Sequence, residues 1–169
     1  MSTRDRGADA SPRDGETGTA SDAQSLAERS VTRLYDGDRA SQALGMRIVE
    51  AGPGRAKLTM TVRRDMLNGH EICHGGFITT LADSAFAFAC NSRNEATVAS
   101  GLSVDFLAPV KRGDLLTADA VEVARTGRTG VYDIVVTNLA GARVALVRGR
   151  SARLGDRTVI PISTGEEKR

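Results

Sequence analysis

Two features between residues 68 and 83 have the residue types of an acyl-transfer site. A loop ends in Gly75-Gly76 directly before a run of helical spacing, and Asp83 lies well inside that run. The first N–H groups of a helix lack internal partners and carry partial positive charge, so they can polarise a carbonyl oxygen or hold an oxyanion. A carboxylate can attack such a carbonyl or act as a general base. Taken alone, the glycines fit a flexible helix start equally well, and helix carboxylates more often face solvent.

The spacing of these two features limits how they can act together. Gly75 and Asp83 are eight residues apart, which corresponds to about 12 Å along a helix. One carbonyl group cannot easily contact both positions in the same chain. Two antiparallel copies of the helix, related by a two-fold axis, would bring Gly75 of one chain near Asp83 of the other. We therefore expect a homodimer with its active site at the interface.

Other polar residues of the segment are weaker candidates. Asn68-Gly69 is first of all a turn dipeptide, although the Asn68 side chain could orient a base or the substrate. His70 and His74 are four residues apart across a loop and lack a carboxylate–histidine motif, so we expect no metal. Cys73 adjoins His74, but neighbours in sequence rarely have catalytic contact geometry. A packed and inert thiol is the better interpretation of Cys73.

Basic side chains form small clusters near expected turns. The formal net charge is +2, and the cations are spread among nearly as many acids, which argues against nucleic-acid binding. Lys111 and Arg112 adjoin one turn, while Gly127, Arg128 and Thr129 lie in another. A glycine-rich turn with a guanidinium offers backbone N–H groups and a cation together, and this combination suits phosphate groups.

The rest of the chain predicts a single domain that positions these residues. Its 169 residues fit one domain. We expect a disordered tail at 1–22, an ordered domain at 23–160 and a flexible C-terminal tail at 161–169. The expected elements are a helix at 22–36, strands at 44–51 and 55–62, a long helix at 74–91, and strands at about 96–108, 115–125, 130–139 and 142–154. One long central helix wrapped by a mostly antiparallel sheet of about six strands is an α+β layout.

The sequence predicts neither export nor membrane insertion. Residues 1–25 lack an apolar signal region, and no run approaches the roughly 18 apolar residues of a membrane helix. Without export, Cys73 and Cys90 are expected to stay reduced. We expect a cytoplasmic protein that does not contact a membrane.

Motifs spread over residues 44–155 identify a family. They are Asn68-Gly69, Cys73-His74-Gly75-Gly76, Leu81-Ala82-Asp83, Ala85-Phe86-Ala87-Phe88-Ala89-Cys90-Asn91-Ser92, Val104-Asp105-Phe106-Leu107-Ala108-Pro109, Thr129-Gly130-Val131-Tyr132-Asp133-Ile134 and Arg148-Gly149-Arg150-Ser151. As a group they closely resemble hotdog-fold acyl-CoA thioesterases, in particular the hydroxyphenylacetyl-CoA thioesterases of phenylacetic acid degradation. The resemblance implies the hotdog fold for nearly the whole ordered domain.

The resemblance also implies an activity and the residues that perform it. Asp83 would be the nucleophile or general base, and the Gly75 N–H would polarise the thioester carbonyl. Asn68 and His74 would help to place the base and the thioester. The substrate would be phenylacetyl-CoA or hydroxyphenylacetyl-CoA, hydrolysed to the free acid and coenzyme A without a cofactor. Catalytic pairing across a homodimer is implied, commonly within a homotetramer of two dimers.

The substrate-binding residues follow from the same resemblance, with two departures from it. The Gly127–Thr129 turn matches where relatives hold the phosphates of coenzyme A. The predicted substrate-binding set is Gly76, Ser100, Lys111, Arg112, Gly127, Arg128 and Thr129. Some relatives carry a hydroxyl one turn after the acid, where this chain has Ala87. Others have a serine at the start of the following strand, where Ala99 stands with Ser100 beside it.

Three alternatives stay open. A hotdog hydratase or dehydratase would rely on a paired Asp and His in a different pattern at the helix start, whereas Asp83 lies well inside the helix. A non-catalytic acyl-CoA-binding protein would not need a buried carboxylate. An unrelated α+β domain is the third alternative.

Overall fold

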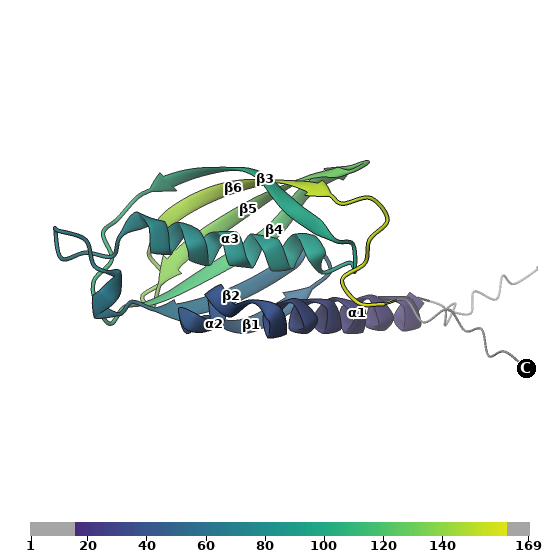
Figure 1. Cartoon of the computed structure of the whole chain (residues 1–169), viewed down its shortest axis with the longest axis horizontal. Coiled ribbons are helices and arrows are strands. Elements are labelled where there is room, and N and C mark those ends of the chain that lie inside the picture. Colours follow the sequence, from purple (N-terminus) through teal and green to yellow (C-terminus); the bar gives the residue numbers. More distant parts are fainter. Residues whose placement is uncertain (1–15, 162–169) are drawn as a thin grey trace, which may run out of the picture.

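The chain folds as one sheet with helices packed against it (Figure 1). A computed structural model describes residues 16–161. Its helices are α1 (Glu16–Gly37), α2 (Arg39–Ala43), the short 3₁₀ helix η1 (Arg64–Met66) and α3 (Gly75–Asn91). Its strands are β1 (Arg47–Gly52), β2 (Arg55–Thr61), β3 (Thr97–Phe106), β4 (Leu115–Thr126), β5 (Thr129–Asn138) and β6 (Arg143–Arg153).

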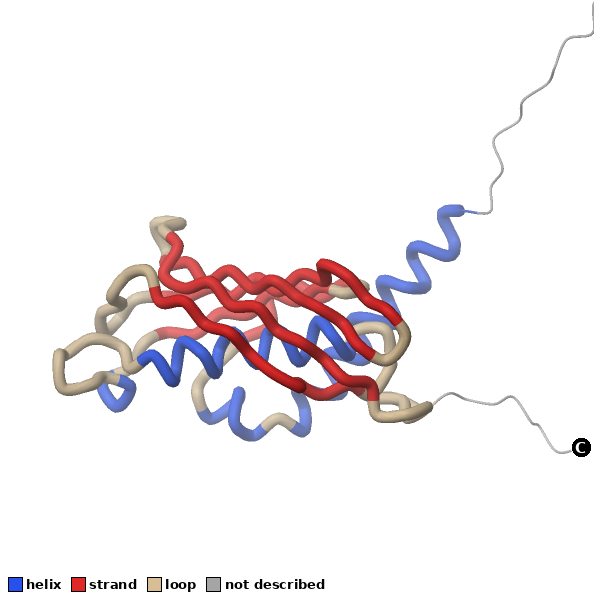
Figure 2. Tube along the Cα trace, turned by 90° about the horizontal axis from the view of Figure 1, so that it is seen from above, coloured by secondary structure: helices blue, strands red, loops and turns tan. Residues whose placement is uncertain are grey.

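The sheet has six strands in the order β1-β2-β4-β5-β6-β3, and every neighbouring pair is antiparallel. β1 and β3 are therefore the two edge strands. The strands form one curved layer with α3 lying along it (Figure 2). The expected α+β class, with one long helix against about six strands, is confirmed.

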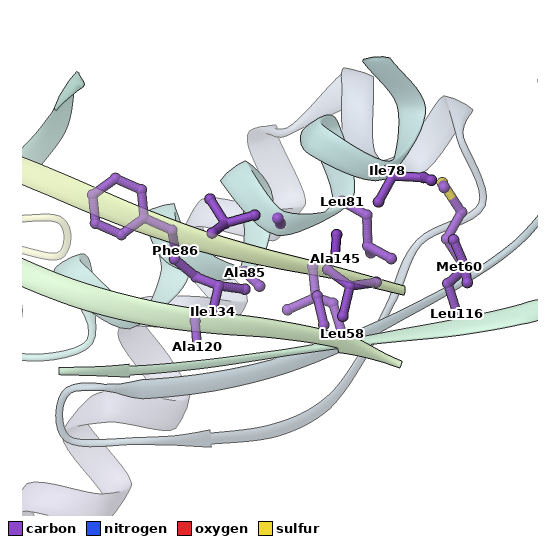
Figure 3. Close-up of a cluster of buried hydrophobic side chains, with 14 of the residues drawn as sticks. Leu58, Met60, Ile78, Leu81, Ala85, Phe86, Leu116, Ala120, Ile134 and Ala145 are labelled. Atoms are coloured by element: carbon purple, nitrogen blue, oxygen red, sulfur yellow. The ribbon is translucent and has the colours of Figure 1, made fainter. Parts of the chain in front are cut away.

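The hydrophobic core lies between the inner face of the sheet and the buried face of α3. Every second residue of β2 and of the first half of β4 is buried, which turns Leu58 and Leu116 toward the helix. Ala85 is fully buried on the helix face opposite them (Figure 3). Phe86 packs directly on β6, because a Cβ atom at Gly149 would lie 3.0 Å from its ring carbons. Glycine at this position lets the backbone approach the ring.

The N-terminal helix begins earlier than expected. α1 starts at Glu16, so residues 16–22 are helical where a disordered tail was expected; residues 1–15 lie outside the described part of the chain. Ala27 and Val31 are fully buried and anchor the middle of α1. Helix propagation adds one hydrogen bond for each residue fixed, so anchored turns can support exposed turns before them.

The short helix α2 was not expected from the sequence. Asp38 caps it by accepting a hydrogen bond from the Ser41 backbone N–H at 3.0 Å. Five residues are too few to show a helical period, and the sequence predicted no element between 36 and 44. β1 accordingly starts at Arg47 rather than at 44.

The other element boundaries agree with the sequence expectation to within two residues. After β6 the chain returns to the end of α3, where the Ile160 N–H donates to the Asn94 side chain at 2.7 Å. This contact holds the end of the described domain. The C-terminal tail expected at 161–169 lies, except for Pro161, outside the described residues.

Candidate active site

The N-terminus of α3 is built from the His74-Gly75-Gly76 motif. His74 is the N-cap, and its Nδ1 atom accepts a hydrogen bond from the Gly76 N–H at 2.9 Å. The His74 N–H itself donates to the Met66 carbonyl at 2.8 Å, which ties the helix start to η1. Gly75 is the first residue of the helix, so its N–H has no partner within the helix. That N–H is a preformed donor for an oxygen of a ligand.

Asn68 shapes the loop that leads into this helix. Its Oδ1 atom accepts hydrogen bonds from the backbone N–H groups of His70 at 2.9 Å and Ile72 at 3.4 Å. The Asn68 N–H also donates to the Ile72 carbonyl at 2.8 Å. The turn expected from Asn68-Gly69 is therefore present, and the Asn68 side chain holds it closed.

A largely apolar cavity of about 710 Å³ opens beside the Gly75 backbone. It is lined by Asn68, Ile72, Cys73, His74, Gly75, Gly76, Ile78, Thr79, Phe106, Leu107, Ala108, Pro109 and Val110. The Phe106 ring, at the end of the edge strand β3, lies against Gly75, since a Cβ atom there would be 2.7 Å from the ring. A thioester carbonyl at the helix start would thus have apolar surface around it.

Asp83 lies midway along α3 and is half-buried, not fully solvated. Burial raises the pKa of its carboxyl above the ordinary value of 3.8, and the nearby Asp38 raises this pKa further. Among the described residues no cation contributes to the shift. The ionised side chain is consequently a stronger base than an exposed aspartate, which suits either a nucleophile or a general base.

The two thiols do not have the character of nucleophiles. Cys73 and Cys90 are both free and buried. Burial raises the pKa of the Cys73 thiol, and it raises the pKa of Cys90 to about 12. Both thiols are therefore protonated near neutral pH, in agreement with the expectation of packed, inert cysteines.

The cations expected to bind substrate lie at different places. Lys111 and Arg112 are exposed and line an open cavity of about 640 Å³ next to the loop at 68–73. The turn at 127–129 joins β4 to β5 and lies near Cys90, at the other end of α3. In this turn, the Arg128 guanidinium donates to the Arg153 carbonyl at 3.0 Å.

Ser100 sits at an irregularity of the edge strand. The register between β3 and β6 shifts between Ala99 and Gly101, and the Ser100 hydroxyl donates to the Arg150 carbonyl at 3.0 Å. The residue is exposed. Its hydroxyl is thus engaged with its own sheet in the single chain.

Comparison with known proteins gives the family of this chain. A family model described as the thioesterase superfamily matches residues 70–145. The chain is 49% identical over 122 residues to acyl-coenzyme A thioesterase PaaI of Escherichia coli (strain K12), which covers 72% of this chain and 87% of the relative. The chain belongs to the thioesterase superfamily.

Solved structures match most of the chain. The E. coli PaaI protein from the phenylacetic acid degradation operon superposes with a TM-score of 0.78 at 45% identity, over 80% of this chain and 98% of that chain. The smu.793 protein of Streptococcus mutans UA159, solved with acetyl CoA bound, gives a TM-score of 0.64 at 29% identity, over 67% and 91% of the two chains. The hotdog fold expected from the sequence is confirmed.

Most candidate residues of this thioesterase-superfamily chain form two groups at opposite ends of α3, and Asp83 lies between them. Asn68, His74, Gly75 and Gly76, with Lys111 and Arg112 beside them, lie at the N-terminal end. The turn at 127–129 lies at the C-terminal end, and the 17 residues of α3 span about 25 Å. A single protomer does not bring the two groups together.

Two residues beside the site were missed. Asp38 precedes Ser41 by three residues, a spacing that signals a helix cap but says nothing of Asp83, which is distant in sequence. Phe106 belongs to one of the family motifs, but its contact with Gly75 depends on how β3 returns past α3. Neither the charge of Asp38 near Asp83 nor the contact of Phe106 with Gly75 has a signal in the local sequence.

Among residues 16–161 there is no group of three His, Cys, Asp or Glu side chains that could hold a metal ion. No helix in the same range is long and apolar enough to cross a membrane. The expected absence of a metal and of a cofactor stays a prediction, as does the cytoplasmic location.

Proposed function

We propose that this protein hydrolyses acyl-CoA thioesters, with phenylacetyl-CoA or hydroxyphenylacetyl-CoA as the preferred substrate. The observation that carries the proposal is the α3 start, where Gly75, the first residue of the helix, lines an apolar cavity on a chain 49% identical to an acyl-coenzyme A thioesterase. An apolar cavity beside one oriented donor suits an aryl group attached to a polarised carbonyl.

In this proposal Asp83 either attacks the thioester carbon itself or activates a water molecule that attacks it. In the first, an Asp83 carboxylate oxygen bonds to the thioester carbon, the C–S bond breaks, and coenzyme A leaves as the thiolate and takes up a proton. Water then cleaves the mixed anhydride and regenerates the carboxylate. In the second, Asp83 takes a proton from a water molecule that attacks the same carbon. The raised pKa of Asp83 is compatible with both routes.

The site is completed by a second copy of the chain across β3. β3 is an edge strand, and it exposes Val98 and Phe106 at its two ends. An exposed edge strand with apolar side chains is a template for strand pairing. Antiparallel pairing of two β3 strands places the Phe106 end of one beside the Val98 end of the other. Gly75 of one protomer then faces the α3 helix of its partner, and with it the partner's Asp83.

The same dimer accounts for two groups of phosphate-binding residues. Lys111 and Arg112 would lie beside the Gly75 of their own protomer, and the partner would supply its turn at 127–129. Guanidinium, ammonium and turn N–H groups all suit the phosphates of coenzyme A. The E. coli relative is named for an acyl-coenzyme A substrate, and the S. mutans relative was solved with acetyl CoA.

We further propose that two dimers form a tetramer through the outer face of the sheet. Val121 of β4 and Leu146 of β6 are exposed there, on the side away from α3. Apolar side chains on an outer sheet face are common at interfaces between subunits. Light scattering at several protein concentrations measures this assembly, and a dimer at all of them would contradict the tetramer.

Release of free thiol by the purified protein tests the proposed activity. The panel contains phenylacetyl-CoA, hydroxyphenylacetyl-CoA, benzoyl-CoA and short linear acyl-CoAs. We expect the arylacetyl esters to give the highest kcat/KM. Asp83→Asn should lower kcat by about a thousandfold or more while the circular dichroism spectrum stays the same.

Asp22→Asn is the matched control for that variant. Asp22 is exposed on α1 and is distant in sequence from the site. The activity of the Asp22→Asn variant should therefore equal that of the wild type. Near-normal turnover in Asp83→Asn would exclude both routes through this carboxylate. Binding of acyl-CoA without thiol release would favour the acyl-CoA-binding alternative.

A further inference from the structure

The junction between α1 and α2 is held firmly against α3. Tyr35, in the last turns of α1, packs edge-on against Phe88 of α3, with ring centroids 6.2 Å apart. The Tyr35 hydroxyl also donates to the Met46 carbonyl at 2.6 Å. In α2, the Ser41 hydroxyl lies 2.8 Å from the hydroxyl of Ser84, the residue that follows Asp83 on α3. Contacts from both helices therefore fix the junction at the middle of α3.

Asp38 is the residue of the junction itself, and both its carboxylate oxygens are engaged. Oδ1 accepts from the Ser41 N–H at 3.0 Å, and Oδ2 accepts from the Ser41 hydroxyl at 2.5 Å. Through Ser41 this carboxylate is linked to Ser84, one residue from Asp83. The negative charge of Asp38 is thus held in place beside Asp83 and does not move freely in solvent.

Asp38 and the Asp83 face of α3 also meet in one cavity of about 580 Å³. Asp38 lines it together with Ala87, which lies one helical turn after Asp83 and so on the same face. The remaining lining comes from the end of α1, the start of β3 and the segment after β6. Asp38 and the helix face that carries Asp83 therefore border the same space, although Asp83 itself does not line it.

Few other charges face this part of α3. Arg33 of α1 lines the cavity and is exposed. The Cys90 thiol, on α3 itself, is neutral at working pH because burial raises its pKa to about 12. The pKa of Asp83 is raised by burial and by Asp38, and Arg33 does not counter this effect. Among the described residues, Asp38 is the charged side chain that acts on Asp83.

We propose that Asp38 is a positioning residue for thioester hydrolysis: fixed at the start of α2 and linked to α3 through Ser41 and Ser84, it sets the charge environment in which Asp83 reacts. The inference rests on the proposed function of Asp83. Asp38 touches no reacting atom and acts through Asp83 alone. Its charge disfavours further negative charge nearby and makes the ionised Asp83 take up a proton or attack carbon more readily.

The pH dependence of kcat/KM separates this role from that of a helix cap. Asparagine is as good an N-cap as aspartate, so Asp38→Asn keeps α2 and removes the charge. The acidic limb of the profile should move to lower pH, because Asp83 then stays ionised in more acidic solution. At a pH on the acidic limb of the wild-type profile, the rate relative to the plateau rate should rise about two- to fivefold.

Three further variants make the measurement specific. Asp38→Glu keeps the negative charge, so its pH dependence of kcat/KM should match that of the wild type. Asp36→Asn removes an exposed charge two residues away, outside the cavity, and should leave the profile unchanged. If Asp38→Asn does not fold, Asp38→Ser supplies another neutral capping residue.

A profile that does not move in a folded, neutral Asp38 variant overturns the inference, even if the rate falls, because Asp38 is then only a cap. An equal shift in Asp36→Asn also overturns it. If the wild type hydrolyses no acyl-CoA, the proposed function fails, and the inference is tested by ¹³C NMR titration of the Asp83 carboxyl. A lower titration midpoint in Asp38→Asn than in the wild type is the expected result; equal midpoints contradict it.

Discussion

Gly75 and Asp83 lie on the same helix, one at its N-terminus and the other at its midpoint, so about 12 Å of helix axis separates them. The Gly75 N–H opens into a cavity that Asp83 does not line. The cavity that reaches the Asp83 face lies instead beside the second half of α3. Asp83 itself lines neither cavity. We infer from this separation that Gly75 and Asp83 of one protomer serve different sites.

Replacing Gly75 by proline tests the donor without breaking the helix. Proline is favoured at the first helical position, and His74 before it has the extended backbone (φ −62°, ψ 132°) that precedes proline. Gly75→Pro removes the N–H and should lower kcat by about a hundred- to a thousandfold. Thiol release measures the rate, and circular dichroism checks the fold.

Gly75→Ala is the control for that variant. It keeps the N–H but adds a Cβ atom against Phe106. We expect it to retain much more activity than Gly75→Pro, because the crowded atoms belong to the far end of the Phe106 side chain, which can shift. Equal losses in the two variants would mean that crowding of Phe106, not the donor, matters.

The ionised Asp83 side chain should lower the free energy of unfolding of the protein. A carboxyl whose pKa is raised on folding binds protons more tightly in the folded state, so stability falls as pH rises from the ordinary pKa of 3.8 through the folded value. Asp83→Asn removes this loss. The variant should have a higher urea midpoint than the wild type at neutral pH, and the difference should vanish in acid. Measured at one protein concentration, a lower midpoint at neutral pH would show that a partner stabilises the ionised Asp83.

Lys111 should contribute to binding through the phosphates of the substrate. Lys111→Ala should raise KM for acyl-CoA about two- to tenfold, with less effect at high salt, because an exposed cation is screened. Its kinetics on a short N-acetylcysteamine thioester, which lacks phosphates, should not change. Arg47→Ala, which removes an exposed cation from β1, is the control. An equal loss on the short thioester would place Lys111 at the reacting end of the substrate.

The sequence predicted those helices and strands in which buried residues recur at a regular spacing. The long helix was placed within one residue of α3, because Ile78, Leu81 and Ala85 recur at helical spacing and are all buried. β2 was predicted from strict alternation, which the structure reproduces. α2 could not be found this way, since it is held by Asp38 and Ser41 contacts instead of an apolar face.

The candidate site was predictable only where its residues adjoin in sequence. His74, Gly75 and Gly76 meet at one helix start, and their arrangement follows from N-terminal helix geometry. The contact of Phe106 with Gly75 and the charge of Asp38 near Asp83 arise from the tertiary fold. A single sequence has no period or motif that reports such contacts.

Mixing two inactive variants tests the central claim, that Gly75 of one protomer works with Asp83 of its partner. Gly75→Pro and Asp83→Asn chains are co-expressed, and random pairing gives hybrid dimers in which one of the two sites is intact. The mixture should recover about a quarter of wild-type activity although each parent is inactive.

A chain carrying both substitutions, co-expressed with equal wild type, gives the second half of this measurement. With shared sites every hybrid is inactive, so activity should fall to about a quarter of the wild-type value, whereas independent sites would leave about a half. Recovery to about a quarter in the first mixture and a fall to about a quarter in the second is the predicted result. No recovery in the first, with about a half retained in the second, would contradict the shared site.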